Sequence, residues 1–260
     1  GASFALNADK TLAVQGPAFA EALVATRWRR SNDGWVCEQG LREKPLDNLA
    51  AIYHAMMLGL RDYVGKNRFP GVLLGLSGGI DSAISAAVAV DALGPDRVLG
   101  VRLPSPYSSG HSLDDAAETG KLLSMRVDTV EIEPAMKAFD QMLRRLYNDK
   151  PPDITEENIQ ARARGLALMA LSNKLGHMVL TTGNKSEMSV GYATLYGDMC
   201  GGYSVLKDVY KTAVYALSHW RNGNFPAGAL GPKGRAIPER SIAKAPSAEL
   251  KPNQTDQDTL

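Results

Sequence analysis

Short apolar runs alternate with helix-like segments along the middle of the chain, and this alternation constrains the fold more than any other feature. Four runs have the length of buried strands, namely residues 71–76, 97–104, 126–132 and 177–183. Helical segments are predicted between or beside them, at residues 82–93, 112–124 and 135–147 and in a helix that begins after Asp153 with a capping-box-like Glu156. The pattern predicts an α/β fold, a doubly wound parallel sheet with helices on both faces.

The sequence Ser-Gly-Gly-Ile-Asp-Ser, residues 77–82, joins the first predicted strand to the first predicted helix. Loops at the carboxyl ends of parallel strands bind ligands, and glycines let backbone N–H groups approach an anion at a helix N-terminus. We expect Ser77 and Ser82 to donate to phosphate oxygens. The loop lacks the lysine of a GxxxxGK[ST] motif, and Asp81 suits a Mg²⁺ ion shared with phosphate. The alternative is a glycine turn with Asp81 as a helix N-cap.

A second polar segment follows the fourth predicted strand, at residues 181–212. Glu187 would lie at the same sheet edge as Asp81 and supply a second carboxylate for the metal; alternatively it is a solvated loop carboxylate. Lys207 and Lys211 are four residues apart and would share a helix face if the helix begins by residue 207. One of them could stabilise charge on a leaving pyrophosphate, although most such lysines form a solvated face.

The loop SGGIDS resembles that of the PP-loop ATP pyrophosphatase superfamily. The blocks NIQARARG, TGNKSE, GYATLYGDM, KDVYKT and KAPSAEL are similar, in order, to the synthetase domain of NAD synthetase of the glutamine-dependent kind. This resemblance covers residues from about 45 to the C-terminus. It implies an adenine nucleotide α-hydrolase-like fold.

The resemblance also implies roles for individual residues. Asp81 and Glu187 would hold Mg²⁺, and both would act in catalysis with Lys211. Arg162, together with Glu187, would contact the dinucleotide substrate. Two arginines two positions apart on a helix point about 200° apart, so only one faces the site, and Arg164 is interpreted as a surface residue. ATP would be bound by Gly75, Leu76, Ser77, Gly78, Gly79, Ile80, Asp81, Ser82, Thr182, Lys211 and Ser247, with Asn184 as the alternative to Thr182. Leu195 and Ser204 stand where ammonia-dependent relatives carry Lys and Asp, which leaves those two contacts open.

The activity implied by the resemblance is ATP-dependent amidation of deamido-NAD to NAD through an adenylated carboxylate, with release of AMP and pyrophosphate. Ammonia would come from glutamine in the intact enzyme. A homodimer or higher homo-oligomer is also implied. An alternative is another PP-loop amidating or thiolating enzyme acting on a nucleotide or tRNA, for which Cys200 is the candidate thiol. A nucleotide-binding module without catalysis is a third interpretation.

The N-terminal part has a different character. Residues 3–15 have a hairpin pattern and resemble the end of a nitrilase-like glutaminase domain, so we expect residues 1–44 to be that end plus a linker that includes TRWRRSNDGW. Residues 45–260 would form the synthetase domain, incomplete at its C-terminal end, with no element predicted beyond Asn222. Lys and Arg number 29 against 28 Asp and Glu, which gives no reason to expect nucleic acid or membrane binding. Two cysteines and the lack of a signal-peptide pattern favour a cytoplasmic protein.

Overall fold

The structure, a computed structural model, describes residues 1–148, 150–245 and 249–250. The chain divides into two compact units, residues 1–58 and 59–260. The first unit holds two antiparallel hairpins, one from β1 (Phe4–Leu6) and β2 (Leu12–Gln15), the other from β3 (Arg27–Ser31) and β4 (Gly34–Gln39). The first hairpin confirms the pattern predicted for residues 3–15.

The second hairpin overturns one expectation, because TRWRRSNDGW was interpreted as a linker. Arg29 pairs with Val36, and Arg30 pairs with Trp35, across a tight turn that ends at Gly34, whose φ is +113°. The strands were missed because their exposed faces carry arginines, so the alternation of apolar and polar residues that marks a half-buried strand is weak.

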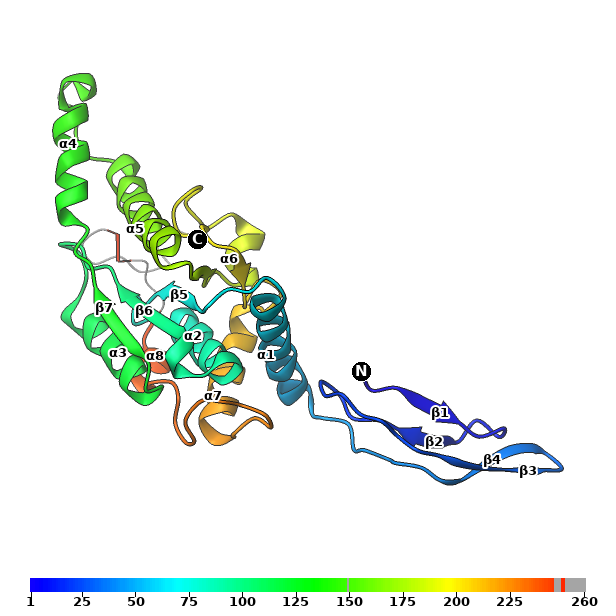
Figure 1. Cartoon of the computed structure of the whole chain (residues 1–260). Coiled ribbons are helices and arrows are strands. Elements are labelled where there is room, and N and C mark those ends of the chain that lie inside the picture. The colour runs from blue at the N-terminus through cyan, green and yellow to red at the C-terminus, as the bar shows by residue number, and fades with distance from the viewer. Residues whose placement is uncertain (149, 246–248, 251–260) are drawn as a thin grey trace. The chain divides into compact units, whose positions relative to one another are not determined.

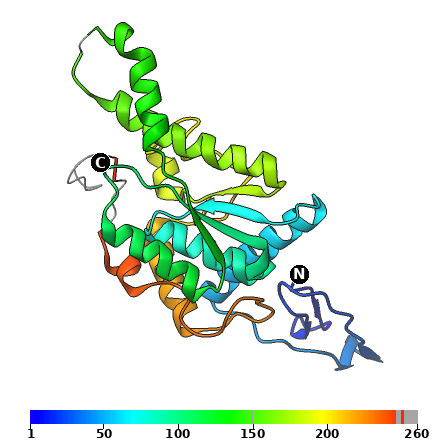
Figure 2. The same cartoon turned by 60° about the vertical axis from the view of Figure 1, so that its left-hand side comes forward.

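The second unit contains a five-stranded parallel sheet at its centre (Figures 1 and 2). The predicted doubly wound parallel sheet is therefore confirmed, and a very short strand, β9, extends it at one edge. Every strand is slightly shorter than the apolar run that predicted it. In spatial order the strands are β7 (Arg126–Thr129), β6 (Val98–Arg102), β5 (Val72–Gly75), β8 (Met178–Thr181) and β9 (Tyr203–Ser204).

Helices cover both faces of this sheet. Those described are α1 (Asn48–Lys66), α2 (Ile80–Leu93), α3 (Gly110–Leu122), α4 (Glu133–Tyr147), α5 (Ile154–Leu175), α6 (Lys185–Val190), α7 (Lys211–Gly223) and α8 (Glu239–Ala243), with a 3-10 turn at Pro95–Arg97. Helix α5 packs against β5 and β8 on one face, whereas α2 and α3 cover the other (Figure 2).

Each helix can be traced to its sequence. Every residue of α2 except Asp81 is buried, because its alanine-rich surface lets the helix lie close to the sheet on one side and to α7 on the other. Helix α5 begins with the expected capping box. The Asp153 side chain accepts from the Glu156 backbone N–H, and the Glu156 side chain accepts from the Asp153 backbone N–H. Helix α8 lies beyond Asn222, where no element was predicted.

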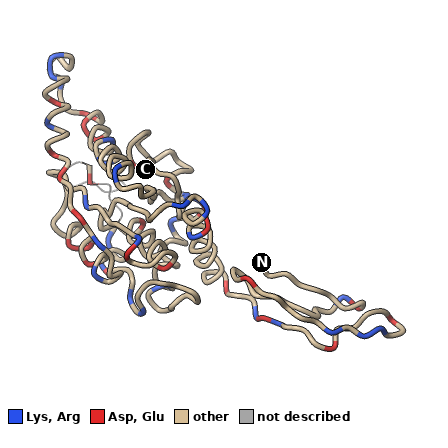
Figure 3. Tube along the Cα trace, in the orientation of Figure 1, with Lys and Arg blue, Asp and Glu red and all other residues tan. Residues whose placement is uncertain are grey.

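The hydrophobic core on the α5 side of the sheet combines strand and helix residues. Its buried members are Leu73, Leu99, Val101, Leu103, Ile132, Leu168 and Val179. Lys and Arg residues lie among Asp and Glu residues along most of the trace of this unit (Figure 3), in keeping with a formal net charge of +1. Among the described helices, none combines the length and the apolar character needed to cross a membrane.

Candidate active site

The loop at residues 77–82 follows β5 and leads into α2, as predicted. The Ser77 and Ser82 hydroxyls lie 3.2 Å apart, and Ser82 Oγ donates to the Gly79 carbonyl at 3.0 Å. The Gly79 N–H donates to Ser77 Oγ at 3.2 Å. The two hydroxyls therefore brace the loop from within, which was not part of the sequence-based interpretation.

Gly78 is required in this loop for two reasons. Its φ is +82°, in the region that favours glycine, and a Cβ atom there would collide with the backbone of Ser112. Its carbonyl accepts a hydrogen bond of 2.9 Å from the buried Ser241 hydroxyl of α8. The loop is thus held between the first turn of α3 and the short helix α8.

Three side chains meet at the entrance to α2. Lys211, the first residue of α7, forms a hydrogen-bonded ion pair with Asp81. Asn184 Nδ2 donates to the other Asp81 oxygen at 3.0 Å. Asp81 lies in the first turn of α2 and Gly79 is the N-cap, so the interpretation of Asp81 as a helix cap is wrong.

Glu187 is positioned by the start of helix α6. Its Oε2 accepts from the Asn184 backbone N–H at 3.0 Å, and its own N–H donates to Asn184 Oδ1 at 3.1 Å, which completes a capping box. Asn184 therefore connects the two carboxylates, Asp81 and Glu187. The sequence signal for this was available, because Asn184 and Glu187 have the capping-box spacing.

Lys211 interacts electrostatically with both carboxylates, Asp81 and Glu187. Burial lowers the pKa of Lys211, but the charge and hydrogen bond of Asp81 and the charge of Glu187 outweigh it, so the pKa of Lys211 is raised above its ordinary value. Lys211 is therefore a cation that both carboxylates stabilise. Lys207 is four residues earlier but precedes α7. The condition for a shared helix face, a helix that begins by residue 207, is therefore not met.

Asp81, Glu187 and Lys211 line one cleft of about 320 Å³ at the carboxyl ends of β5, β6 and β8. The residues that the sequence analysis predicted for the site and that line this cleft are Gly75, Leu76, Ser77, Gly79, Ile80, Asp81, Ser82, Thr182, Glu187 and Lys211. Gly78 supports the loop from behind and is not part of the lining. Ser247 lies outside the described residues.

The two arginines of α5 are placed differently from the interpretation made on sequence. Arg164 is half-buried and lines the cleft, with its Nε donating to the Leu103 carbonyl at 3.1 Å. Arg162 is exposed, and its Nε donates to the Leu195 carbonyl at 3.2 Å. The interpretation of Arg164 as a surface residue is therefore wrong. Helical geometry separates the two side chains but does not say which of them faces the site.

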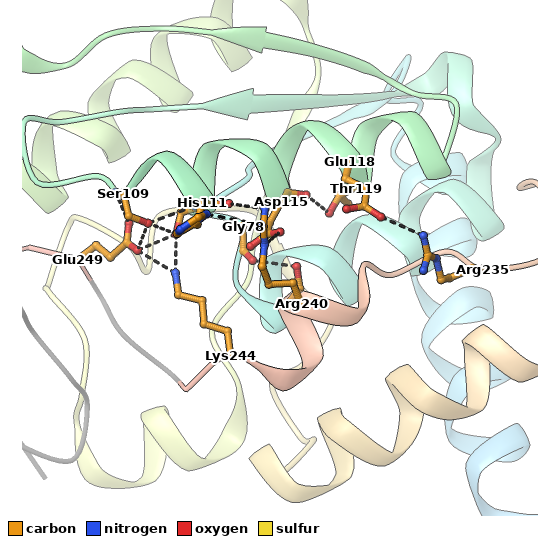
Figure 4. A network of polar contacts seen from close by, with 12 residues as sticks. Gly78, Ser109, His111, Asp115, Glu118, Thr119, Arg235, Arg240, Lys244 and Glu249 are labelled. Atoms are coloured by element: carbon orange, nitrogen blue, oxygen red, sulfur yellow. Dashed lines mark hydrogen bonds and ion pairs between the residues drawn. The ribbon is translucent and has the colours of Figure 1, made fainter.

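Lys244 and Glu249, from the C-terminal part of the chain, also line the cleft and belong to a network of polar contacts with α3 (Figure 4). Glu249 accepts hydrogen bonds from the N–H and Oγ of Ser109 and from Ser112 Oγ, and it pairs with Lys244 at 2.8 Å. Burial raises the pKa of Glu249, but these bonds outweigh it and hold the pKa below its ordinary value. Arg240 adds an ion pair of 2.6 Å to the buried Asp115 of α3. None of these contacts between the C-terminal part of the chain and α3 was predicted from the sequence.

Cys200 also lines the cleft. Its Sγ lies 3.6 Å from the Gly165 carbonyl, as a weak donor, and burial followed by the nearby charge of Asp198 raises the pKa of the thiol. A raised pKa keeps the sulfur protonated and makes it a poor nucleophile.

Comparison with known proteins agrees with this geometry. A family model described as NAD synthase matches residues 52–260. The chain belongs to the NAD synthase family. The family resemblance and the α/β fold expected from the sequence are both confirmed.

Several members of the NAD synthase family are close in sequence. The chain is 52% identical over its whole length to a glutamine-dependent NAD(+) synthetase of Rhodobacter capsulatus and covers 47% of that protein. It is 46% identical to a glutamine-dependent NAD(+) synthetase of Acinetobacter baylyi and covers 46% of that protein. The chain therefore spans about half the length of the curated relatives it matches.

Solved structures of the NAD synthase family match as well. The glutamine-dependent NAD+ synthetase of Acinetobacter baumannii, in complex with ADP, has a TM-score of 0.86 at 45% identity, covering 96% of this chain and 46% of that one. The NMN synthetase of Francisella tularensis has a TM-score of 0.71 at 29% identity, covering 82% and 81%.

The donor set of the cleft fits the Mg²⁺ ion expected from the NAD synthase resemblance. No group of three or more His, Cys, Asp or Glu side chains arranged for a metal occurs in residues 1–148, 150–245 and 249–250. Two carboxylates of the same cleft, Asp81 and Glu187, are nevertheless present, and Mg²⁺ is commonly held by one or two carboxylates with phosphate oxygens supplying further ligands.

Proposed function

We propose that this chain catalyses the ATP-dependent amidation of deamido-NAD to NAD, with AMP and pyrophosphate as the other products. The observation that carries the proposal is the meeting of Asp81, Lys211 and Asn184 beside a glycine loop at the carboxyl end of β5, in a cleft of the NAD synthase family. Glutamine would supply the ammonia in the whole protein, because the curated relatives are named glutamine-dependent NAD(+) synthetases.

The first step would form the adenylate. The nicotinate carboxylate attacks the α-phosphorus of ATP, and the bond to pyrophosphate breaks, so negative charge grows on the leaving group. The loop at residues 77–82 is braced before ATP arrives, and Lys211 would turn from Asp81 to the phosphate oxygens; donors held in position stabilise such charge most effectively. ATP would be held by the cleft residues from Gly75 to Ser82 and by Thr182, with Gly78 supporting the loop and Ser247 as a further contact. Asp81 and Glu187 would hold Mg²⁺, which supplies charge neutralisation for the phosphates when bound.

The second step would consume ammonia. Ammonia attacks the acyl carbon of the mixed anhydride, AMP leaves with the bonding electrons, and the nitrogen loses a proton to give the carboxamide of NAD. Neither step needs a nucleophile from the protein, so positioning and electrostatics supply the catalysis. We propose from the family resemblance that Arg162 contacts the dinucleotide, although Arg162 is exposed on α5 and is not among the residues that line the cleft.

Further parts of the proposal concern the whole protein. We propose that residues 1–44 belong to the glutaminase side of the enzyme and residues 45–260 to the synthetase side. The active form would be a homodimer or higher homo-oligomer in the cytoplasm, where Cys37 and Cys200 would stay unpaired, as they are in this structure. A thiolating enzyme is disfavoured by the raised pKa of Cys200.

An ammonia-driven assay tests this function. ATP, Mg²⁺, deamido-NAD and ammonium chloride are incubated with the protein, and NAD, AMP and pyrophosphate are measured together. A parallel reaction replaces deamido-NAD with nicotinate mononucleotide. We expect the three products in equal amounts. Turnover of nicotinate mononucleotide but not of deamido-NAD would instead make the enzyme an NMN synthetase. AMP formed without NAD or NMN would support adenylation and reject deamido-NAD as the acceptor. No AMP with any of these substrates would contradict the proposal.

A further inference from the structure

Of the three cationic side chains that line the cleft, Lys211, Lys244 and Arg164, two are in ion pairs with described residues. Lys211 pairs with Asp81, and Lys244 pairs with Glu249. Arg164 makes no ion pair with any described residue, and its hydrogen bond to the Leu103 carbonyl uses Nε alone. Neither Nη group bonds to a described residue, and Arg164 lines the cleft that also contains the glycine loop at residues 77–82.

The surroundings of Arg164 make an uncompensated charge unfavourable. Burial lowers the pKa of Arg164 to about 10, against the opposing charges of Glu249 and Asp198. The nearby carboxylates are engaged elsewhere: Glu249 is bonded to Ser109, Ser112 and Lys244, and Asp198 Oδ1 accepts from the Thr194 N–H at 2.9 Å. At neutral pH the guanidinium is charged and poorly solvated, and it has no ion pair with a described residue, so an incoming anion would stabilise it.

We propose that Arg164 binds a pair of anionic oxygens of the substrate, phosphoryl or carboxylate, through its two Nη groups. The planar guanidinium matches such an oxygen pair bidentately, and Nε is already fixed by Leu103, so the fork is oriented before binding. Helix α5 fixes the backbone of Arg164, because its neighbours Ala163 and Gly165 are buried. This assignment rests on the proposed function, in which the anion belongs to ATP or to deamido-NAD.

Direct binding measurements test the assignment. The affinities of the intact protein for ATP and for deamido-NAD are measured separately by calorimetry, for wild type, Arg164→Ala and Arg164→Lys. We expect Arg164→Ala to weaken one of the two ligands about ten- to hundredfold, the range expected for losing charge-assisted hydrogen bonds, and to leave the other within twofold. The ligand affected identifies the source of the anion. Arg164→Lys should recover part of the loss, because it keeps the charge and loses the fork.

Arg97 provides a matched control. It also binds backbone carbonyls, those of Pro70 and Phe69 at 2.9 Å each, but it lies where β6 begins, at the end of the sheet away from the cleft. Arg97→Ala should leave both affinities unchanged. The salt dependence of binding gives a second readout, since loss of a contact between charges lowers the slope of log Kd against log salt, whereas a packing defect does not.

The outcomes separate this assignment from the proposed function. Unchanged affinity for both ligands in folded Arg164→Ala, with normal wild-type turnover, would overturn the role of Arg164 alone. Weakened binding of ATP by the variant, with no NAD formed by wild type, would overturn the function and keep the anion contact. If Arg164→Ala does not fold, Arg164→Lys decides, and wild-type affinity for both ligands in that variant would reject the bidentate contact.

Discussion

At the scale of single residues, the pairing of Asp81 with Lys211 prepares the site for a change of partner. Both groups are about one-fifth exposed, at 17% and 23% of their side-chain surface, so each is accessible from the cleft. In the proposed reaction, phosphate oxygens would attract Lys211 while Asp81 turns to the metal. Asn184 limits this rearrangement, because it bonds to Asp81 and to the backbone of Glu187 at once.

Replacing Asp81 tests this role. We expect Asp81→Asn to reduce kcat for AMP formation about 10²- to 10³-fold, the usual loss when one preorganised electrostatic contact is removed. The amide is isosteric, so the fold should be retained, as judged by circular dichroism. Asp62→Asn is the control, because Asp62 is half-exposed on α1 and pairs with Lys66 in the next turn. Wild-type turnover by Asp81→Asn would reject both the metal and the catalytic assignments.

Single residues also show where sequence reasoning reached its limit. The glycine loop, Asp81 and Lys211 were found from motif and spacing, and the structure brings them into one cleft. Arg164 was misassigned, because a helix of nearly uniform polarity carries no signal for which side faces the sheet. That side was decided by Leu168, which packs into the core one turn later and so turns Arg164 toward the cleft.

At the scale of elements, the short helix α8 sets the conformation of the loop at residues 77–82. Ser241 is 2% exposed, and its hydroxyl bonds to the Gly78 carbonyl across 163 positions in sequence. Arg240, in the same helix, is tied to the buried carboxylate of Asp115 on α3. A helix of five residues has little stability of its own, so these contacts hold it in place.

We expect Ser241→Ala to raise the KM for ATP with little effect on that for deamido-NAD. The Gly78 carbonyl would lose its partner at a cost of about 1–3 kcal/mol, and roughly tenfold weaker binding follows for each 1.4 kcal/mol that reaches the ATP complex. Steady-state kinetics with each substrate varied in turn measure this. Ser218→Ala is the control, because that equally buried hydroxyl bonds to Val214 within α7, away from the loop. Equal effects of the two changes on KM would contradict a positioning role for Ser241.

At the scale of the whole second unit, one buried ion pair connects distant segments. The Arg221 guanidinium of α7 bonds to both carboxylate oxygens of Asp91 on α2, at 2.6 and 3.1 Å, and to the carbonyls of Pro232 and Gly234, at 3.0 Å each. Both side chains have no exposed surface. The pair thus joins the helix that begins with Lys211 to the helix that contains Asp81, and it anchors the connection to α8.

Arg221→Met should destabilise the protein by about 3–5 kcal/mol, because it leaves the Asp91 carboxylate buried without its cation. Urea unfolding followed by circular dichroism measures the change in the free energy of unfolding. Lys66→Met removes an exposed pair between adjacent helical turns, with Lys66 77% exposed, and should cost no more than about 0.5 kcal/mol. A loss below about 1 kcal/mol for Arg221→Met would show that the pair does not hold these segments together.

The sequence by itself determined the features that depend on neighbouring residues: the alternation of strands and helices, the glycine loop, the caps of α5 and α6, and the family. Tertiary structure decided which of the charged side chains meet. Asp81 finds Asn184 and Lys211 at separations of 103 and 130 residues, and such contacts follow from the order of strands in the sheet rather than from any local pattern. The same holds for Arg164 and α8, because periodicity specifies a helix, whereas packing against the sheet specifies its orientation.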